Sequence, residues 1–546
     1  MFSYFRRCLN NSIQIIFDLV TNISTVKHLN IATALIFAIF CFSACQDNSP
    51  DADASVPSKP RQDVPGMKAK RGVILNTDKA AEGYIMFNPT NSGSTYLMNR
   101  EGEVLHEWKG FFHSWLAYLQ DDGRVIRNTV DPDAPVFYAG GMAGRMDEIN
   151  IKGEVLWDFE YATRDYQIHH DIDVLPNGNI LSISWDHRTK EELIAAGRKA
   201  EYIPDDGLWF DKIIEVKPTR PFGGEIVWEW RMWDHIIQHT DPSLPNYGDP
   251  ADHPELMDIN VHGMEPPETM HPDTLMKRRR QGRAHRNQTI GSEGADLFHC
   301  NAVDYNEELD QIVFSAPHIN EIFIIDHSTT TREAASHRGG RYGKGGDFLF
   351  RWGNPHNYHR GDSTDQTLFG QHDTRWILDD YPGEGHITMY NNDIPGGPDS
   401  TRYSAIFELD IPMNEDGSYP LREDGTFGPD GPTWSYVAQD TASFYSPFVS
   451  GAMRLKNGNT FILQGAAGRM FEVTAEGEMV WEYWNPYRGG VREPNGDTGF
   501  EAPFFWWLFR STFIPADHPG LQNIDLTPLE KQPEAFKPPK PPAAAG

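Results

Sequence analysis

The sequence predicts an all-β protein, a β-propeller with long loop insertions. Gly (48 residues) and Pro (39 residues) are plentiful while long helical patterns are scarce, which indicates many short strands joined by turns. Two phrases also return along the chain: a hairpin with a polar entry, and a glycine turn followed by a strand that ends in an aromatic residue. Units that recur roughly every 40 to 70 residues are typical of four-stranded propeller blades.

The hairpin is clearest at residues 169–181, HHDIDVLPNGNIL. A strand over Asp171 to Leu175 leads into Pro-Asn-Gly-Asn, where the Asn-Gly pair tolerates the positive φ of a tight turn. A second strand then starts at Ile180. The same pattern recurs in four further stretches: 114–126, 297–315, 370–390 and 450–463.

The second phrase is Gly-Glu, two apolar residues, any two residues and then an aromatic residue, over the length of one strand. Its copies are GEVLHEW (102–108), GEVLWDF (153–159), GEIVWEW (224–230) and GEMVWEY (477–483), with degenerate copies DFLFRW (347–352) and TWSYVAQD (433–440). Six units can be counted, and the sequence alone leaves five, six or seven blades open. The stretch 232–268 has no period-2 pattern and is interpreted as a long loop excursion that shapes a binding mouth.

The net charge of −30 excludes two classes of partner. Such a surface repels nucleic acid and anionic lipid, so neither is expected to bind. The basic run at 276–286, MKRRRQGRAHR, is interpreted as a solvated loop. An anionic substrate would therefore need a locally basic pocket.

The N-terminal part carries a predicted export signal. The apolar run 31–45, IATALIFAIFCFSAC, follows Lys27 and ends in small residues, as secretory signals do. Its last residues, FSAC, resemble a bacterial lipoprotein cleavage site with Cys45 as the lipidated first mature residue; a plain signal peptide cut near Ala44 is the alternative. If Cys45 is acylated, Cys300 is the other cysteine left and no internal disulfide is expected.

Four segments are predicted in all. They are a signal peptide at 1–45, a flexible Pro/Ser/Asp-rich tether at 46–71, the propeller at 72–514 and a loose Pro/Lys/Ala-rich tail at 515–546. The protein is thus expected in the periplasm or anchored to the outer membrane, with the lipid as its sole membrane contact.

His170, His299 and His372 each open a hairpin of the same type. Since equivalent positions of successive blades form a ring around the propeller axis, these three residues are expected to meet in space. Converging imidazoles suit a metal site or group transfer and acid–base catalysis near neutral pH. The positions lack a short ligand pair such as His-x-x-x-His, so neither a metal nor another cofactor is predicted, although a metal-dependent hydrolase stays an alternative.

Amide and guanidinium groups near the blade entries and turns could hold an anionic group. The candidates are Asn301, Arg375, Asn391, Asn392, Arg402 and Arg454.

Taken together, these phrases resemble the bacterial arylsulfate sulfotransferase family. The resemblance covers roughly Gly83 to Pro486 and rests on HHDIDVLPNGNIL, LFHCNAVDYNEELDQIVFS with EIFIID, GQHDTRW with HITMYNND, and GAMRLKNGNTFILQGAAGRMFEV with GEMVWEYWNP. It implies a six-bladed periplasmic propeller that moves a sulfuryl group from a phenolic sulfate ester to a phenol without a nucleotide donor. In that family a histidine is transiently sulfated, and further His, Asn and Arg residues hold the sulfate.

The resemblance also implies roles for individual residues. His299-x-Asn301 and His372 match the channel histidines best, with Asn391 and Arg402 near the turn that carries sulfate donors. The family's sulfated histidine is expected in a later blade, where 443–451 has Phe448 and no histidine. His372 or His299 is then the nucleophile, the other polarises the sulfate and His170 is the acid–base partner.

Arginine is expected to neutralise the sulfate, with Arg375, Arg402 and Arg454 as candidates. The predicted partners are a small aryl sulfate donor and a phenol acceptor, and no oligomeric state is predicted. The alternative is a non-catalytic propeller lipoprotein that acts as a binding or scaffold module.

Overall fold

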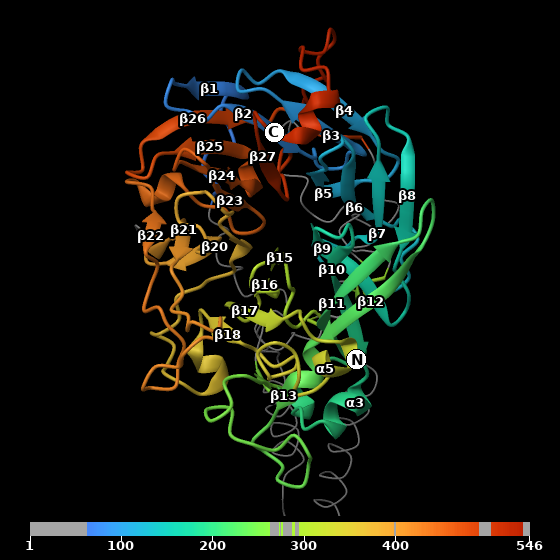
Figure 1. Ribbon diagram of the computed structural model, residues 1–546, viewed down its shortest axis with the longest axis vertical. Coiled ribbons are helices and arrows are strands. Elements are labelled where there is room, and N and C mark those ends of the chain that lie inside the picture. Colours follow the sequence, from blue (N-terminus) through green and yellow to red (C-terminus); the bar gives the residue numbers. More distant parts are fainter. Residues whose placement is uncertain are drawn as a thin grey trace, which may run out of the picture. The chain divides into compact units, whose positions relative to one another are not determined.

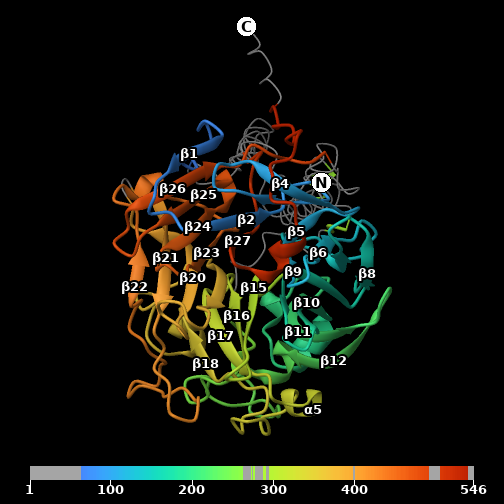
Figure 2. The same ribbon diagram turned by 45° about the horizontal axis from the view of Figure 1, so that its top comes forward.

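The computed structural model describes residues 63–261, 272–273, 275–276, 287–289, 294–397, 400–490 and 504–538. Over these residues the strands form six sheets of four or five strands and one two-stranded sheet. The six large sheets are arranged around a common axis (Figure 1, Figure 2). The predicted all-β, six-bladed propeller is therefore confirmed. The predicted signal segment, Cys45 and residues 46–62 of the predicted tether lie outside the described residues.

Blades 1 to 3 take all but one of their strands from the first half of the chain. From the axis outward they are β27 (Ser511–Pro515), β2 (Gly83–Phe87), β3 (Ser94–Met98) and β4 (Val104–Lys109) in blade 1; β5 (Ser114–Leu119), β6 (Val125–Val130), β7 (Gly144–Ile149) and β8 (Val155–Glu160) in blade 2; β9 (Tyr166–Val174), β10 (Ile180–Arg188), β11 (Leu208–Pro218) and β12 (Gly224–Arg231) in blade 3.

Blades 4 to 6 follow, and blade 6 gains an extra outer strand from the start of the described chain. They are β15 (Ala302–Asn306), β16 (Gln311–Ala316), β17 (Glu321–Asp326) and β18 (Phe350–Trp352) in blade 4; β19 (His372–Trp376), β20 (Ile387–Pro395), β21 (Arg402–Leu409) and β22 (Trp434–Tyr436) in blade 5; β23 (Gly451–Arg454), β24 (Thr460–Gln464), β25 (Arg469–Val473), β26 (Met479–Trp484) and β1 (Gly72–Asn76) in blade 6.

The excursion after blade 3 carries the two-stranded parallel sheet of β13 (Ile236–Ile237) and β14 (Met257–Asp258). The described helices are short: α3 (Lys190–Ala195), α5 (Thr331–Ala334), and the 3-10 helices η2 (Ala200–Tyr202), η3 (Met232–His235), η4 (Pro355–Tyr358), η6 (Thr441–Ser443), η7 (Gly465–Ala467) and η8 (Pro519–Asn523). None of these helices has the length and apolar character that crossing a bilayer requires.

Blade 1 closes the ring because it combines strands from both ends of the described chain. β27 runs to Pro515 and pairs with β2, so the propeller extends beyond the predicted boundary at 514. The prediction of a loose tail is wrong for residues 516–538. Leu521 and Ile524 are buried, and the Leu529 amide donates to the Val104 carbonyl at 3.0 Å, because this segment covers apolar surface of the first blades.

A tryptophan in the fourth strand from the axis contacts the next blade, and this holds for all six blades. These six strands coincide with the copies of the glycine–aromatic phrase. Each indole Nε1–H donates to a backbone carbonyl of the following blade, at distances from 2.7 to 3.3 Å. Because a buried indole N–H needs an acceptor, this bond fixes how closely successive blades pack. The donors are Trp108, Trp157, Trp230, Trp352, Trp434 and Trp481.

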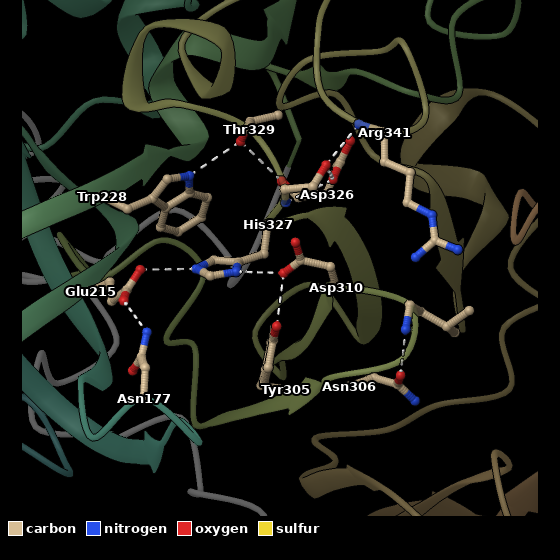
Figure 3. A network of polar contacts seen from close by, with 12 residues as sticks. Asn177, Glu215, Trp228, Tyr305, Asn306, Asp310, Asp326, His327, Thr329 and Arg341 are labelled. Atoms are coloured by element: carbon tan, nitrogen blue, oxygen red, sulfur yellow. Dashed lines mark hydrogen bonds and ion pairs between the residues drawn. The ribbon is translucent and has the colours of Figure 1, made fainter.

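Figure 3 shows an ionic contact that joins blades 3 and 4. The His327 Nε2 lies 3.1 Å from a Glu215 carboxylate oxygen of β11, and its Nδ1 lies 2.8 Å from Asp310. Tyr305 also donates to Asp310 at 2.8 Å, and the Trp228 ring lies 4.8 Å from the imidazole. Burial would lower the pKa of His327, but the two carboxylates outweigh it and raise this pKa to about 9. His327 is therefore a cation between two anions at neutral pH.

His327→Gln is expected to lower the free energy of unfolding by about 2 kcal/mol near neutral pH. Since the folded-state pKa of about 9 lies above the ordinary value of 6.5, this stabilisation is complete below about pH 6 and is lost as pH rises through 9. The melting temperatures of both proteins, measured at about pH 6 and about pH 10, should therefore converge at the higher pH. His253→Gln serves as the control, because its pair with Glu255 is exposed. An equal difference in melting temperature at both pH values would contradict the assignment.

Candidate active site

The predicted histidines come from three consecutive blades. His170 lies in β9, His299 shortly precedes β15 and His372 is the first residue of β19. The ring centroids of His170 and His299 are 4.3 Å apart, with an angle of 77° between the rings. His372 interacts electrostatically with both of these rings. The structure therefore gathers three residues that are far apart in the sequence.

The three histidines do not occupy one equivalent position of the repeat. His170 and His299 have a left-handed backbone, with φ of 54° and 56°, and the pairing of β9 with β10 shifts register at this point. In blade 5 the left-handed residue is Asp373 (φ 57°), so His372 precedes the corresponding position by one residue. The expectation of exact equivalence is wrong, because a bulge moves a side chain without leaving a mark in the hairpin pattern.

His170 is held by its sequence neighbour. Its Nδ1 lies 2.7 Å from the Nδ1 of His169, whose Nε2 lies 2.8 Å from Asp211. The His169 ring also stacks on Trp185 at 4.1 Å. The Asp211 carboxylate favours the proton on His169 Nε2, which leaves His169 Nδ1 as an acceptor. His170 therefore donates from its own Nδ1, and its Nε2 carries the free electron pair. Burial, and then the charge of His299, hold the pKa of His170 well below its usual value.

His299 is paired with a carboxylate. Its Nδ1 lies 2.5 Å from Asp296 Oδ2, and its ring stacks on His318 at 4.5 Å. Burial would lower the pKa of His299, but Asp296 outweighs it and the pKa is raised. Burial and the neighbouring His299 lower the pKa of His318 to about 4. The pKa of His299 is thus higher than those of His170, His318 and His372. Asp296, His299 and His318 also offer ligand atoms close enough together for a metal ion.

His372 has a fixed tautomer. Its Nδ1 lies 2.9 Å from both the Gly370 carbonyl and Asn392 Oδ1, and its Nε2 accepts the Val449 N–H at 3.1 Å. The proton therefore sits on Nδ1 and the electron pair on Nε2. Burial, followed by the charge of Arg510, lowers the pKa of His372 to about 3, so the ring is neutral at pH 7.

Arg510 is the cation of this cluster. It directly precedes β27, is 2% exposed, and its charge lowers the pKa of both His170 and His372. Its guanidinium donates to the carbonyls of Ser450 (2.5 Å) and Asn301 (3.0 Å). It also lies 3.2 Å from Asp373 and 3.5 Å from Asp171.

Two predicted substrate-binding residues lie near the inner strands, Asn301 buried and Arg375 partly buried. Asn301 donates to the Gln371 carbonyl at 2.9 Å, which links blades 4 and 5. Arg375 pairs with Asp373, and although burial would lower its pKa, this carboxylate raises it. Both side chains therefore support the fold around the histidines.

Asn391, Arg402 and Arg454 hold parts of blade 5 and its neighbours in place. Asn391 donates to a backbone carbonyl at 2.9 Å, and Arg402 donates to the Asp393 carbonyl at 2.7 Å. Arg454 pairs with Glu408 of β21. Substrate binding by these three residues stays a prediction.

Sequence reasoning missed His169, Asp296, His318 and Arg510. His169 carried a signal, since it is the first of two adjacent histidines at the entry of a strand. Asp296 and His318 lie in connections outside the repeated phrases, and Arg510 directly precedes a strand that no repeated phrase marks. Asp296 lies three residues before His299, and His318 follows β16 of the same blade, so ring closure is needed to bring in Arg510 alone.

Comparison with known proteins adds to this geometry. A family model described as Arylsulfotransferase (ASST) matches residues 131–483. No curated protein matches the chain. Similar solved structures include a Bacteroides caccae protein of unknown function (TM-score 0.38, 11% identity, 75% of this chain and 97% of that one) and virginiamycin B lyase from Staphylococcus aureus (TM-score 0.30, 10% identity, 79% and 88%). Similarities of this size carry no conclusion about the site.

Asp296→Asn is expected to lower the pKa of His299 by about one unit or more, because the opposing charge is removed while the burial remains. NMR titration of the protein labelled in its histidine rings measures this pKa. His372, whose low pKa has other causes, should keep its neutral ring over the same pH range. An unchanged titration of His299 would show that Asp296 does not set its basicity.

Proposed function

Because the chain belongs to the Arylsulfotransferase (ASST) family, we propose that it transfers a sulfuryl group from an aryl sulfate ester to a phenolic acceptor without a nucleotide sulfate donor. The observation that carries this proposal is the convergence of His170, His299 and His372 beside Arg510. Imidazole can act as a nucleophile in group transfer, and adjacent positive charge favours an anionic substrate.

His372 is the proposed nucleophile. Its Nε2 electron pair attacks the sulfur, and the bond between sulfur and the aryl oxygen breaks. Gly370 and Asn392 hold the proton on Nδ1, which leaves the electron pair on Nε2 and supports the positive charge of the sulfated ring. The bond that Nε2 accepts from the Val449 N–H breaks when this electron pair attacks. A pKa of about 3 keeps this ring unprotonated at neutral pH and makes it a good leaving group in the second step. The Val449 N–H, now 3.1 Å from Nε2, is positioned to donate to a sulfuryl oxygen instead.

His299 is the proposed acid and base. Its pairing with Asp296 raises its pKa, so the protonated ring can give a proton to the leaving phenolate. In the second step His299 takes the proton of the incoming phenol while the phenol oxygen attacks sulfur. The sulfur–nitrogen bond then breaks, and His372 regains its electron pair.

His170 assists His299 as a neutral acceptor. The contacts through His169 to Asp211 leave its Nε2 unprotonated, and its ring lies directly against His299. Because the pKa of His170 is held well below its usual value, its ring stays neutral beside a protonated His299 and offers an unprotonated nitrogen as a hydrogen-bond acceptor. Phe509, 5.7 Å from the His170 ring, supplies an aromatic surface that suits an aryl group.

We also propose a lipid anchor at Cys45 and a periplasmic or outer-membrane-anchored location. This proposal rests on the apolar run 31–45 and the FSAC sequence at its end.

The second candidate function is a non-catalytic propeller lipoprotein that binds ligands. It is favoured by one feature: residues 443–451, where the family resemblance leads us to expect the sulfated histidine, contain none. Retention of a covalent sulfuryl group separates the two candidates.

With 4-nitrophenyl sulfate and a phenol acceptor, the wild-type protein should release nitrophenol and retain labelled sulfate. His372→Ala is expected to abolish the retained label and lower the rate by about 10³-fold or more, because the nucleophile is lost. His299→Ala should lower the rate by about 10²–10⁴-fold. His337→Ala, whose side chain is 61% exposed, is the control and should match wild type. A folded wild-type protein that releases no nitrophenol would support the non-catalytic candidate.

Asp211→Asn is expected to lower kcat by about tenfold, to shift the pH dependence of kcat and to leave KM nearly unchanged. Without the carboxylate, His169 no longer keeps its proton on Nε2, and His170 loses the acceptor for its own Nδ1–H. The pH profiles of kcat and KM measure this positioning role. A pH profile identical to that of wild type would remove Asp211 and His169 from the mechanism.

A further inference from the structure

We propose that His239, Asp258 and His359 form a binding site for a divalent transition-metal ion of the zinc type, outside the candidate active site. Their ligand atoms all lie within 4.8 Å of one another. Two imidazoles and one carboxylate are a ligand set that such ions take in proteins, with a water molecule completing the shell.

The local fold explains why these three residues meet. In the parallel pair of β13 and β14, Ile237 lies opposite Asp258, and His239 follows two residues later. The short helix η4 packs beside β14, and His359 caps its C-terminal end with a left-handed backbone (φ 59°). The left-handed turn brings the His359 ring over the end of β14, where its centroid lies 4.7 Å from that of His239.

The distances suit a shared ion. His359 Nε2 and Asp258 Oδ2 are 3.1 Å apart. Two ligands with bonds of about 2.0–2.1 Å at a tetrahedral angle are separated by about 3.3 Å, so these two atoms can bind one ion with little movement. His239 is exposed, and its ligand atom already lies within 4.8 Å of those of Asp258 and His359.

A second carboxylate lies near the ligand His359, at a distance longer than a hydrogen bond. Its Nδ1 faces Asp249 at 3.9 Å, on the side of the ring opposite Asp258. Metal-binding histidines commonly direct their other ring nitrogen to a carboxylate, which fixes the ring and increases its basicity. Asp258 is itself fixed, because it is 4% exposed and its Oδ1 accepts the Asn260 N–H at 2.8 Å.

The other clusters of this kind suit a new site less well. In the group of His235, His337 and Asp347, both His235 nitrogens already make hydrogen bonds of 2.8 Å, to Asp347 and to the Ala334 carbonyl. Asp296, His299 and His318 belong to the candidate active site. The proposed ion would join the excursion after blade 3 to the connection between blades 4 and 5, so we expect it to stabilise this part of the fold.

The test is a calorimetric titration, in which zinc chloride is added to the full chain after bound metal has been removed with EDTA. His239→Ala and His359→Ala should each weaken the strongest zinc site by at least about tenfold, as loss of one ligand does. His253→Ala is the matched control, since His253 is an exposed histidine of the same excursion that pairs with Glu255. It should bind zinc as wild type does.

A second readout is the visible absorption of bound cobalt(II), which reports tetrahedral nitrogen and oxygen ligands and should be lost in Asp258→Asn. Circular dichroism checks that each variant is folded. Zinc affinity and stoichiometry that are unchanged in both His239→Ala and His359→Ala would overturn the proposal. Wild-type protein that does not bind zinc at about 10 μM would overturn it as well.

Discussion

One guanidinium group connects the inner strands of most blades. Arg510 comes from blade 1, and it is almost fully buried at the axis. A buried charge of this kind is tolerated when its hydrogen bonds and opposite charges are provided, and removal of a partner is costly. Tyr118 of blade 2 joins the same group through its 3.0 Å bond to Asp171. The partners of Arg510 are Asp171 of blade 3, the Asn301 carbonyl of blade 4, Asp373 of blade 5 and the Ser450 carbonyl of blade 6.

Carboxylates on the inner strands extend this constraint from blade to blade. Asp173 accepts the Tyr305 N–H at 2.9 Å, and Asp304 accepts the Trp376 N–H at 2.8 Å. Asp373 accepts the backbone N–H at the start of β23 in the same way, at 2.9 Å. The inner strands of blades 3 to 6 are thus each held in register with their neighbour, although they belong to different sheets. The histidines lie at the entries of these strands, so their rings are positioned by the most constrained part of the fold.

The sequence predicts the features that depend on local chemistry. The sequence Leu-Pro-Asn-Gly-Asn predicts the hairpin because its glycine, Gly178, adopts the positive φ of 82° that the tight turn requires. The repeated tryptophans predict the outer strands because each indole needs an acceptor on the next blade. The features that depend on ring closure are not predictable in this way. Arg510 directly precedes the C-terminal strand that completes blade 1, and the local sequence does not show that this strand returns to the axis.

The predicted anion-binding arginines also show the difference between local features and features that depend on ring closure. The positions of Arg402 and Arg454 near turns and blade entries predict that they hold an anion, and the structure gives both a partner in blade 5, Asp393 and Glu408. A position close to a turn is a property of the chain, whereas access to the axis is a property of the assembled ring. The first can be read from the sequence, and the second requires the order and number of the blades.

The stretch 443–451 has a role of its own in the proposed chemistry, because it contacts the proposed nucleophile of the neighbouring blade. It has no histidine, but its backbone reaches the proposed nucleophile twice. The Val449 N–H contacts His372 Nε2, and the Ser446 and Val449 carbonyls accept both protons of the Asn392 amide, whose oxygen faces His372 Nδ1. Asn392 is thereby oriented with its oxygen toward the ring, which fixes the tautomer of His372. We infer that blade 6 acts on sulfuryl transfer through the orientation of a histidine in blade 5, so that a histidine of its own is not required there.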